Sequence, residues 1–344
     1  MRVSRLRRSD CSGPGITRRR HGKGFEYLDE DGNRIDEPEV LARIRELGIP
    51  PAWKDVWVCP YPFGHLQATG TDAAGRKQYL YHPRWRARRD AEKFDDMVRF
   101  AHALPTLRER VERDLERDAL DRPRVLACAV RLLDRGFFRI GSEEYTVQNE
   151  SYGLATMRKS HVVLAGDYEM VFDYPAKSGQ RRIQGIIDPV AYEIVAALKR
   201  RRGGTQELLA YKDGGRWRDL RSEEINAYIK DATGDDFSAK DFRTWNATVL
   251  AAIALSVSGH VAASTTGRKR AITRAIKEVA HYLGNTPAVC RASYIDPRVF
   301  DAYRAGLVIK PPAGQPIHHR EVEEAVLDLI NERERSPAIE KVAA

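Results

Sequence analysis

Apolar and polar positions divide the chain into two regions of different character. Up to about residue 83, short apolar runs alternate with Gly- and Pro-containing turns, which predicts strands. The expected strands are 25–28, 56–58, 65–69 and 78–81. One helix is expected at 39–47, where Val40, Leu41, Ile44 and Leu47 recur at helical spacing before Gly48. Residues 1–86 are therefore predicted to form a small β-rich domain.

Helical spacing dominates from residue 87 to residue 312. A charged amphipathic segment, 93–120, predicts one helix or a pair of helices interrupted at Pro105. Further helices are expected at 124–138, 189–201, 222–232, 240–258, 270–283 and around 297–305. A β interlude is expected at 161–164, 168–174 and 181–187, and its middle strand alternates Tyr168, Met170, Phe172 and Tyr174 with more polar residues.

These patterns predict an α+β fold, with a larger, mainly helical domain that carries an inserted small β-sheet. Residues 313–344 form a predicted tail whose helix, 321–334, has charge on most faces. The pattern leaves open whether this helix packs on the core or contacts a partner.

Composition fits a globular protein with a sizeable core. The 344 residues are 42% hydrophobic and 31% charged, which excludes a disordered tail or a fibre. The formal charge is +9, and 44 of the 58 basic residues are arginines. The guanidinium fork suits a phosphate polymer, but a GC-rich genome also enriches arginine, and composition does not separate the two.

No metal, disulfide or membrane signal stands out. The four cysteines are far apart and the nine histidines are scattered, as expected of reduced thiols in a cytoplasmic protein without a zinc site. The least polar stretch, 246–264, is rich in Ala and Ser and is interpreted as a buried helix. No signal peptide is expected, although the Arg-rich residues 1–24 superficially resemble a transit peptide.

Several polar residues occur where packing alone does not require them. Arg243 stands near the start of an apolar helix and would need an anionic partner there. The segment 283–287, Leu-Gly-Asn-Thr-Pro, has an ordinary interpretation as a glycine cap and a proline-initiated helix, and Tyr294 as a core tyrosine. Taken one at a time, these ordinary interpretations are the stronger ones.

Taken in order, the segments resemble the poxviral and bacterial type IB DNA topoisomerases. The series runs from Phe-Arg-Ile-Gly at 138–141 and a lysine on a β turn to Lys-Asp-Phe-Arg-Thr at 240–244, then 283–287 and a tyrosine. N-terminal segments resemble that family too: 14–20, 50–53, 68–72 and 75–79. The resemblance covers about residues 14–310, so we expect the basic N-terminus to belong to the folded, DNA-facing domain.

The resemblance implies a catalytic set of Arg139, Lys177, Arg243, Asn285 and Tyr294. Tyr294 would attack the scissile phosphate and form a 3′-phosphotyrosyl ester, which conserves the phosphodiester energy without ATP. The two arginines would neutralise the transition state in place of a metal, and Lys177 would protonate the 5′-oxygen. No cofactor is implied.

Asn285 departs from the commonest family pattern, which has histidine at this position. An amide donates a hydrogen bond but carries no charge and transfers no proton. Only a hydrogen bond to a non-bridging oxygen is therefore expected from Asn285.

Duplex DNA is the partner that the resemblance implies. It places Arg76, Lys77, Gln78, Tyr79 and Tyr81 against the DNA, with the basic pair on phosphates and Gln78 at a base edge. Half-buried strand packing remains an equal alternative for the tyrosines. The runs 200–202 and 268–270 suit either DNA or a solvated surface.

The predicted enzyme is a bacterial, cytoplasmic, nucleoid-associated DNA topoisomerase that acts as a monomeric clamp, its domains joined near 83–92. Two alternatives were weighed against it. A tyrosine recombinase uses a similar constellation, but its arginine box differs from 138–141 and the N-terminal segments favour a topoisomerase. A non-catalytic DNA-binding module would have no need of a nucleophile.

Overall fold

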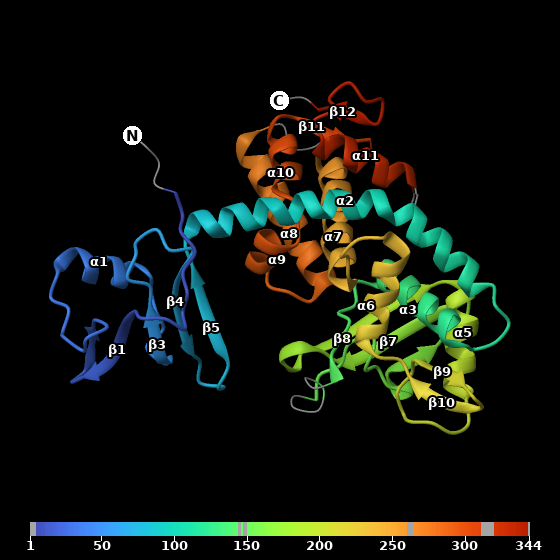
Figure 1. Cartoon of the computed structure of the whole chain (residues 1–344). Coiled ribbons are helices and arrows are strands. Elements are labelled where there is room, and N and C mark those ends of the chain that lie inside the picture. Colours follow the sequence, from blue (N-terminus) through green and yellow to red (C-terminus); the bar gives the residue numbers. More distant parts are fainter. Residues whose placement is uncertain (1–4, 144–145, 147–149, 260–263, 311–319, 343–344) are drawn as a thin grey trace. The chain divides into compact units, whose positions relative to one another are not determined.

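The computed structural model describes residues 5–143, 146, 150–259, 264–310 and 320–342. The chain forms two compact units, 1–93 and 94–344, and the boundary between them falls within helix α2, Pro83–Leu115 (Figure 1). The first unit is β-rich and the second is mainly helical with small sheets. The α+β prediction is therefore confirmed.

The first unit is built on one antiparallel sheet of five strands in the order β2-β1-β3-β4-β5. Its elements are β1 (Ile16–His21), β2 (Gly24–Leu28), α1 (Pro38–Glu46), β3 (Lys54–Val58), β4 (Leu66–Thr71) and β5 (Lys77–Tyr81). Ile44 of α1 packs with Ile16, Val56, Val58 and Ala68 of the sheet to form a small core. Hydrophobic spacing had predicted α1 and four of these strands, but not the Arg-rich β1.

The second unit is organised around the buried helix α7. Trp245 and Phe242 of α7 are almost fully buried, and α7 contacts α3, α8, α10 and α11 (Figure 1). Besides α2, the helices are α3 (Arg122–Gly136), α5 (Pro189–Arg200), α6 (Ser222–Thr233), α7 (Ala239–Gly259), α8 (Thr265–Leu283), α9 (Pro287–Ser293), α10 (Pro297–Arg304) and α11 (Arg320–Ile330).

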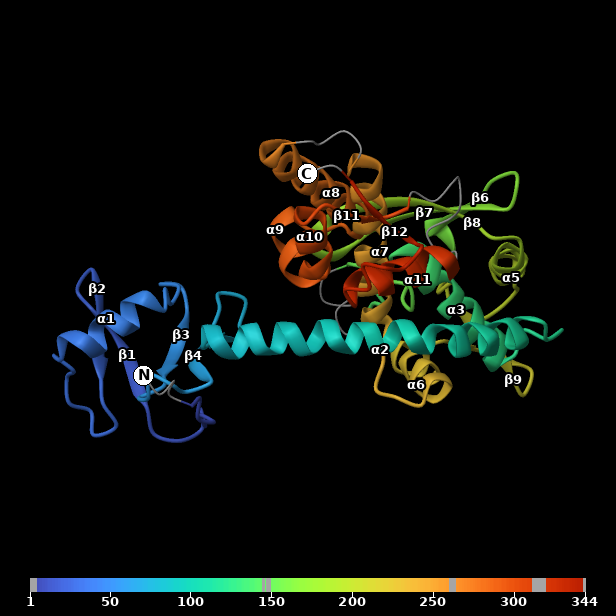
Figure 2. The same ribbon diagram turned by 90° about the horizontal axis from the view of Figure 1, so that it is seen from above.

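Three small sheets complete the second unit. The inserted sheet has the order β6-β7-β8, and it contacts α3 and α5 (Figure 2). Its strands are β6 (Val162–Leu164), β7 (Glu169–Pro175) and β8 (Arg181–Ile187). Two further antiparallel pairs, which hydrophobic spacing did not predict, are β9 (Ala210–Asp213) with β10 (Arg216–Asp219), and β11 (Leu307–Ile309) with β12 (Ile339–Lys341).

Helix α2 continues through Pro105, where an interruption was possible. Proline costs a helix interior about 3 kcal/mol because it removes a hydrogen bond and crowds the preceding turn. Phe100, Leu104, Leu107 and Val111 are buried on both sides of the proline. Their shared apolar face offsets this cost and keeps the helix unbroken.

Helix α11 is tied to the core by a buried ionic network. Arg108 of α2 donates hydrogen bonds to Glu323 at 2.6 and 2.8 Å and to Asp134 at 2.8 and 2.9 Å. The indole N–H of Trp245 donates to Glu323 at 3.1 Å. The described part of the C-terminal segment therefore packs on the core, which settles the question that its charge pattern left open.

Replacing Glu323 with alanine should destabilise the second unit by about 3 kcal/mol, since it leaves a buried guanidinium with half of its partners. Urea unfolding followed by circular dichroism measures the change. Glu324, which is exposed and pairs with Arg320, provides the matched control, and Glu324→Ala should cost no more than about 0.5 kcal/mol. Equal effects of the two substitutions would contradict a structural role for the network.

Candidate active site at the C-terminal end of helix α8

Helix α8 ends in a glycine turn, and its last carbonyl groups can accept hydrogen bonds from donors outside the helix. Gly284 adopts the left-handed conformation with φ 61°, and its N–H donates back to the carbonyls of Ala280 and His281. The N–H of Asn285 also donates to Ala280, at 3.0 Å. The last carbonyls of a helix carry partial negative charge and need external donors.

Three arginines from different elements supply those donors. Arg182 of β8 donates to the carbonyl of His281 at 2.7 Å and to that of Tyr282. Arg243 of α7 donates to Leu283 at 2.9 Å, and Arg139, which follows α3, donates to Gly284 at 3.1 Å. Four consecutive carbonyls thus gather three guanidinium groups at one point.

Arg243 is deeply buried, with 4% of its surface exposed. Its guanidinium also donates to the carbonyl of Phe137, while its Nε has no partner among the described residues. Burial and, to a smaller extent, the charge of Arg139 lower the pKa of Arg243 to about 10, while Tyr294 opposes both effects. At neutral pH the side chain therefore remains protonated.

Arg139 is held in place through its backbone. Helix α3 ends at Gly136 and is capped by Phe137, which takes the left-handed conformation with φ 51°. The carbonyls of Arg139 and Ile140 then accept hydrogen bonds from Leu154 and Ala155 at 2.9 and 2.8 Å. Gly141 has φ 80°, and a side chain there would approach the Cα of Gly153 to 2.8 Å, so the close contact of the two loops requires glycine.

Asn285 lies in the same cluster with its amide orientation fixed. Its Oδ1 accepts a hydrogen bond from Arg139. Its Nδ2 is buried and has no partner among the described residues. Because buried donors are normally paired, the free Nδ2 and the free Nε of Arg243 leave two donors available for an anionic ligand.

Tyr294 directly follows α9 and is half-buried. Its N–H donates to Cys290 at 2.9 Å, and its carbonyl accepts from the hydroxyl of Thr248 at 3.3 Å. The guanidinium carbon of Arg243 lies 5.2 Å from the centre of the Tyr294 ring. The structure thus brings Arg139, Arg243, Asn285 and Tyr294 together.

Lys177 lies apart from the buried members of this set. Its exposed side chain belongs to the short 3-10 turn Lys177–Gly179. It lines a pocket together with Arg139, Ser142 and Tyr152, and Tyr294 is not among the residues that line this pocket. Arg139 therefore belongs both to the cluster around Arg243 and to the pocket that contains Lys177.

The predicted DNA-binding residues of the first unit lie on two faces of β5. Lys77, Tyr79 and Tyr81 are exposed, and the two rings stack with centroids 6.2 Å apart. Tyr79 and Tyr81 are 44% and 40% exposed, so they do not pack in the core as the alternative interpretation required. Gln78 points to the other face and donates to Asp72 at 2.9 Å, and Arg76 pairs with the same carboxylate.

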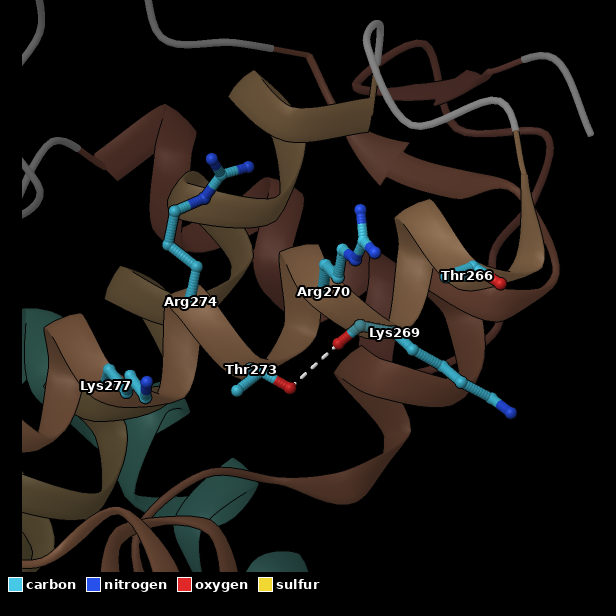
Figure 3. A pocket seen from close by; sticks show the side chains of 6 residues that line it. All are labelled: Thr266, Lys269, Arg270, Thr273, Arg274 and Lys277. Carbon is cyan, nitrogen blue, oxygen red and sulfur yellow. Dashed lines mark hydrogen bonds between the residues drawn. The ribbon is translucent and has the colours of Figure 1, made fainter.

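Helix α8 also carries a basic face. The basic run 268–270 pointed only to the beginning of this face, which extends to Lys277. We define this α8 face by Thr266, Lys269, Arg270, Thr273, Arg274 and Lys277, which together line one pocket (Figure 3). Arg268 from the predicted basic run is directed elsewhere and donates to the carbonyl of Arg304 at 2.7 Å.

Arg201 from the other basic run, 200–202, is buried and donates to the carbonyls of Leu198 and Leu208.

The described residues show neither a metal-binding cluster nor a membrane-spanning helix. They contain no group of three or more His, Cys, Asp or Glu side chains arranged to hold a metal ion. Within the same residues, no helix is long and apolar enough to cross a membrane.

Comparison with known proteins agrees with this arrangement. Residues 82–305 match the catalytic core of eukaryotic DNA topoisomerase I, and residues 24–72 match the N-terminal domain of bacterial DNA topoisomerase IB. The chain is 30% identical to DNA topoisomerase 1B of Acanthamoeba polyphaga mimivirus, over 84% of this chain and 88% of that protein. It is 23% identical to DNA topoisomerase 1B of vaccinia virus, over 75% and 79%. The chain therefore belongs to the type IB DNA topoisomerases, in their viral and bacterial branch.

Proposed function

We propose that this topoisomerase relaxes supercoiled duplex DNA through a covalent bond between Tyr294 and the 3′-phosphate of one cut strand. The observation that carries the proposal is the position of Tyr294 beside buried Arg243, in a cluster with two donors that have no partner among the residues that the structure describes. A phenol is a suitable nucleophile and a suitable leaving group for the reverse step, so strand transfer needs no external energy source.

Arg139, Arg243 and Asn285 would stabilise the transition state. Attack of the Tyr294 oxygen on phosphorus breaks the bond to the 5′-oxygen and increases negative charge on the non-bridging oxygens. Two guanidinium groups and the free Nδ2 of Asn285 are donors of the kind that bind such oxygens. One preorganised donor of this kind is typically worth roughly 100- to 1,000-fold in rate.

Lys177 would protonate the departing 5′-oxygen. Its ammonium group is exposed in a pocket that includes Arg139, so a phosphate held by Arg139 would lie near this pocket. Religation reverses the path, because the 5′-hydroxyl returns its proton and attacks the phosphotyrosine. Between the two steps, the free 5′ end would rotate and release supercoils.

We further propose that the enzyme works as a monomer that closes its two units around the duplex. Exposed Lys77, Tyr79 and Tyr81 and the α8 face would contact the DNA backbone, whereas Gln78 would have to leave Asp72 to reach a base. The match to a bacterial N-terminal domain supports a bacterial source, and the substrate supports a cytoplasmic, nucleoid-associated location.

Tyr294→Phe tests the covalent step. The variant should form no covalent adduct when mixed with duplex DNA and denatured, and it should not relax a supercoiled plasmid in the absence of ATP and magnesium. Its affinity for duplex DNA should remain within about twofold, since only one hydroxyl is lost. An adduct that persists in this variant would show that another residue is the nucleophile.

A pair of substitutions tests the hydrogen bond from Asn285. Asn285→His should keep substantial activity, because an imidazole also donates at this position, whereas Asn285→Ala should lose about 100-fold in single-turnover cleavage rate. Rapid mixing with an end-labelled duplex measures both rates. Equal activity of the alanine variant and the wild type would assign Asn285 a structural role only.

The α8 face should contribute to the salt dependence of binding. Each phosphate contact that is lost should reduce the slope of log affinity against log salt by about 0.9. We expect Lys269→Gln, Arg274→Gln and Lys277→Gln, combined, to flatten the slope, whereas Arg320→Gln, a control at an exposed arginine paired with Glu324, should leave it unchanged. Identical slopes for the triple variant and the wild type would mean that this face is only solvated.

A further inference from the structure

Arg182 is the third guanidinium at the end of α8, and no motif pointed to it. It belongs to strand β8 and is half-buried. Its Nη1 donates to the carbonyl of His281 at 2.7 Å, and its Nη2 donates to that of Tyr282. It thus holds the two carbonyls that directly precede those held by Arg243 and Arg139.

Arg182 also covers the turn that ends the helix. A Cβ built on Gly284 would meet the Cδ of Arg182 at 3.0 Å and its guanidinium carbon at 3.2 Å. A side chain at Gly284 would therefore require Arg182 to shift by a few tenths of an ångström. The position of Arg182 and the path of residues 283–285 therefore depend on each other.

The side chain is itself anchored to the end of α3. Gln184, on the same strand, accepts a weak hydrogen bond from Arg182 at 3.4 Å and donates to the carbonyl of Gly136 at 2.6 Å. Gly136 is followed by Phe137, whose carbonyl receives Arg243. Arg182 and Gln184 thus connect the backbone segments that precede Arg139 with those that precede Asn285.

Burial and a neighbouring cation both oppose the charge of Arg182. Burial lowers the pKa of Arg182, and the charge of Arg139 lowers it further, while the phenol of Tyr174 opposes this shift. Water can also satisfy helix-terminal carbonyls. Capping of α8 therefore does not by itself require a third cation beside two others.

We infer that Arg182 is a positioning residue for strand transfer. It fixes residues 281–285, so that the carbonyl of Gly284 and the amide of Asn285 keep Arg139 aligned on the scissile phosphate. The inference rests on the proposed function, and it assigns Arg182 an effect on rate that passes through Arg139 and not through contact with DNA.

Arg182→Ala and Arg181→Ala form a matched pair for the test. Arg181 is adjacent on β8, but it is exposed and pairs with Asp173, so its removal deletes the same charge without touching α8. Single-turnover cleavage and religation are measured on an end-labelled duplex, together with DNA affinity and thermal unfolding. A misplacement of about 1 Å can cost about 100-fold in rate.

We expect Arg182→Ala to slow cleavage and religation by a similar factor, between about 10- and 100-fold, with unchanged DNA affinity, and Arg181→Ala to match the wild type. Arg182→Lys should restore part of the rate, since an ammonium reaches one carbonyl but not two. In an Arg139→Ala background, Arg182→Ala should cost less than threefold, because residues that act as a unit are not additive.

Three results would overturn the inference. The first is equal rates for Arg182→Ala and Arg181→Ala. The second is an undiminished effect of Arg182→Ala in the Arg139→Ala background, and the third is a rate loss that appears only as weaker DNA binding. Failure of the wild type to form any adduct would instead refute the proposed function, so the two failures are distinguishable.

Discussion

The active site depends on the affinity of a helix C-terminus for cations. The carbonyls of residues 281–284 at the end of α8 are the acceptors, and guanidinium groups from β8, α7 and the segment after α3 are the donors. Three arginines would repel one another if they were left in a low-dielectric setting without compensation. The partial negative charge of the helix end allows them to gather there before any DNA arrives.

This arrangement also explains the donors that remain free. Each carbonyl accepts a hydrogen bond from a guanidinium, and Arg139 orients the amide of Asn285. The Nδ2 of Asn285 and the Nε of Arg243 then have no partner within the described part of the chain. A site built in this way is incomplete until an anion enters it. We propose that the oxygens of a phosphodiester supply the missing acceptors. Tyr294 lies beside Arg243 on the adjoining turn.

Much of this structure could be predicted from residue patterns, since local spacing determines it. Local sequence patterns predict the apolar face of α3, the alternation along β7 and the Gly-Asn-Thr-Pro turn after α8. The short pairs β9–β10 and β11–β12 were missed, because three or four residues carry too little periodicity and β12 pairs with a strand thirty residues earlier. The resemblance named four residues that the structure brings together, but not Arg182. Arg181 and Arg182 are adjacent and identical in the sequence. They differ in their tertiary contacts, because Arg182 binds a carbonyl of α8 and Arg181 pairs with Asp173.

A crystal structure with a duplex nicked at the cleavage site and with vanadate would test the central claim most directly. Vanadate adopts the five-coordinate geometry of the transferring phosphorus, and an enzyme binds such a mimic with the groups that stabilise the transition state. We expect vanadium to bridge the Tyr294 oxygen and the 5′-oxygen, with its other oxygens accepting from Arg139, Arg243 and the Nδ2 of Asn285, while α8 keeps its three arginines. Vanadate bound away from Tyr294, or arginines that leave the end of α8 to reach it, would show that this cluster does not stabilise the transition state as proposed.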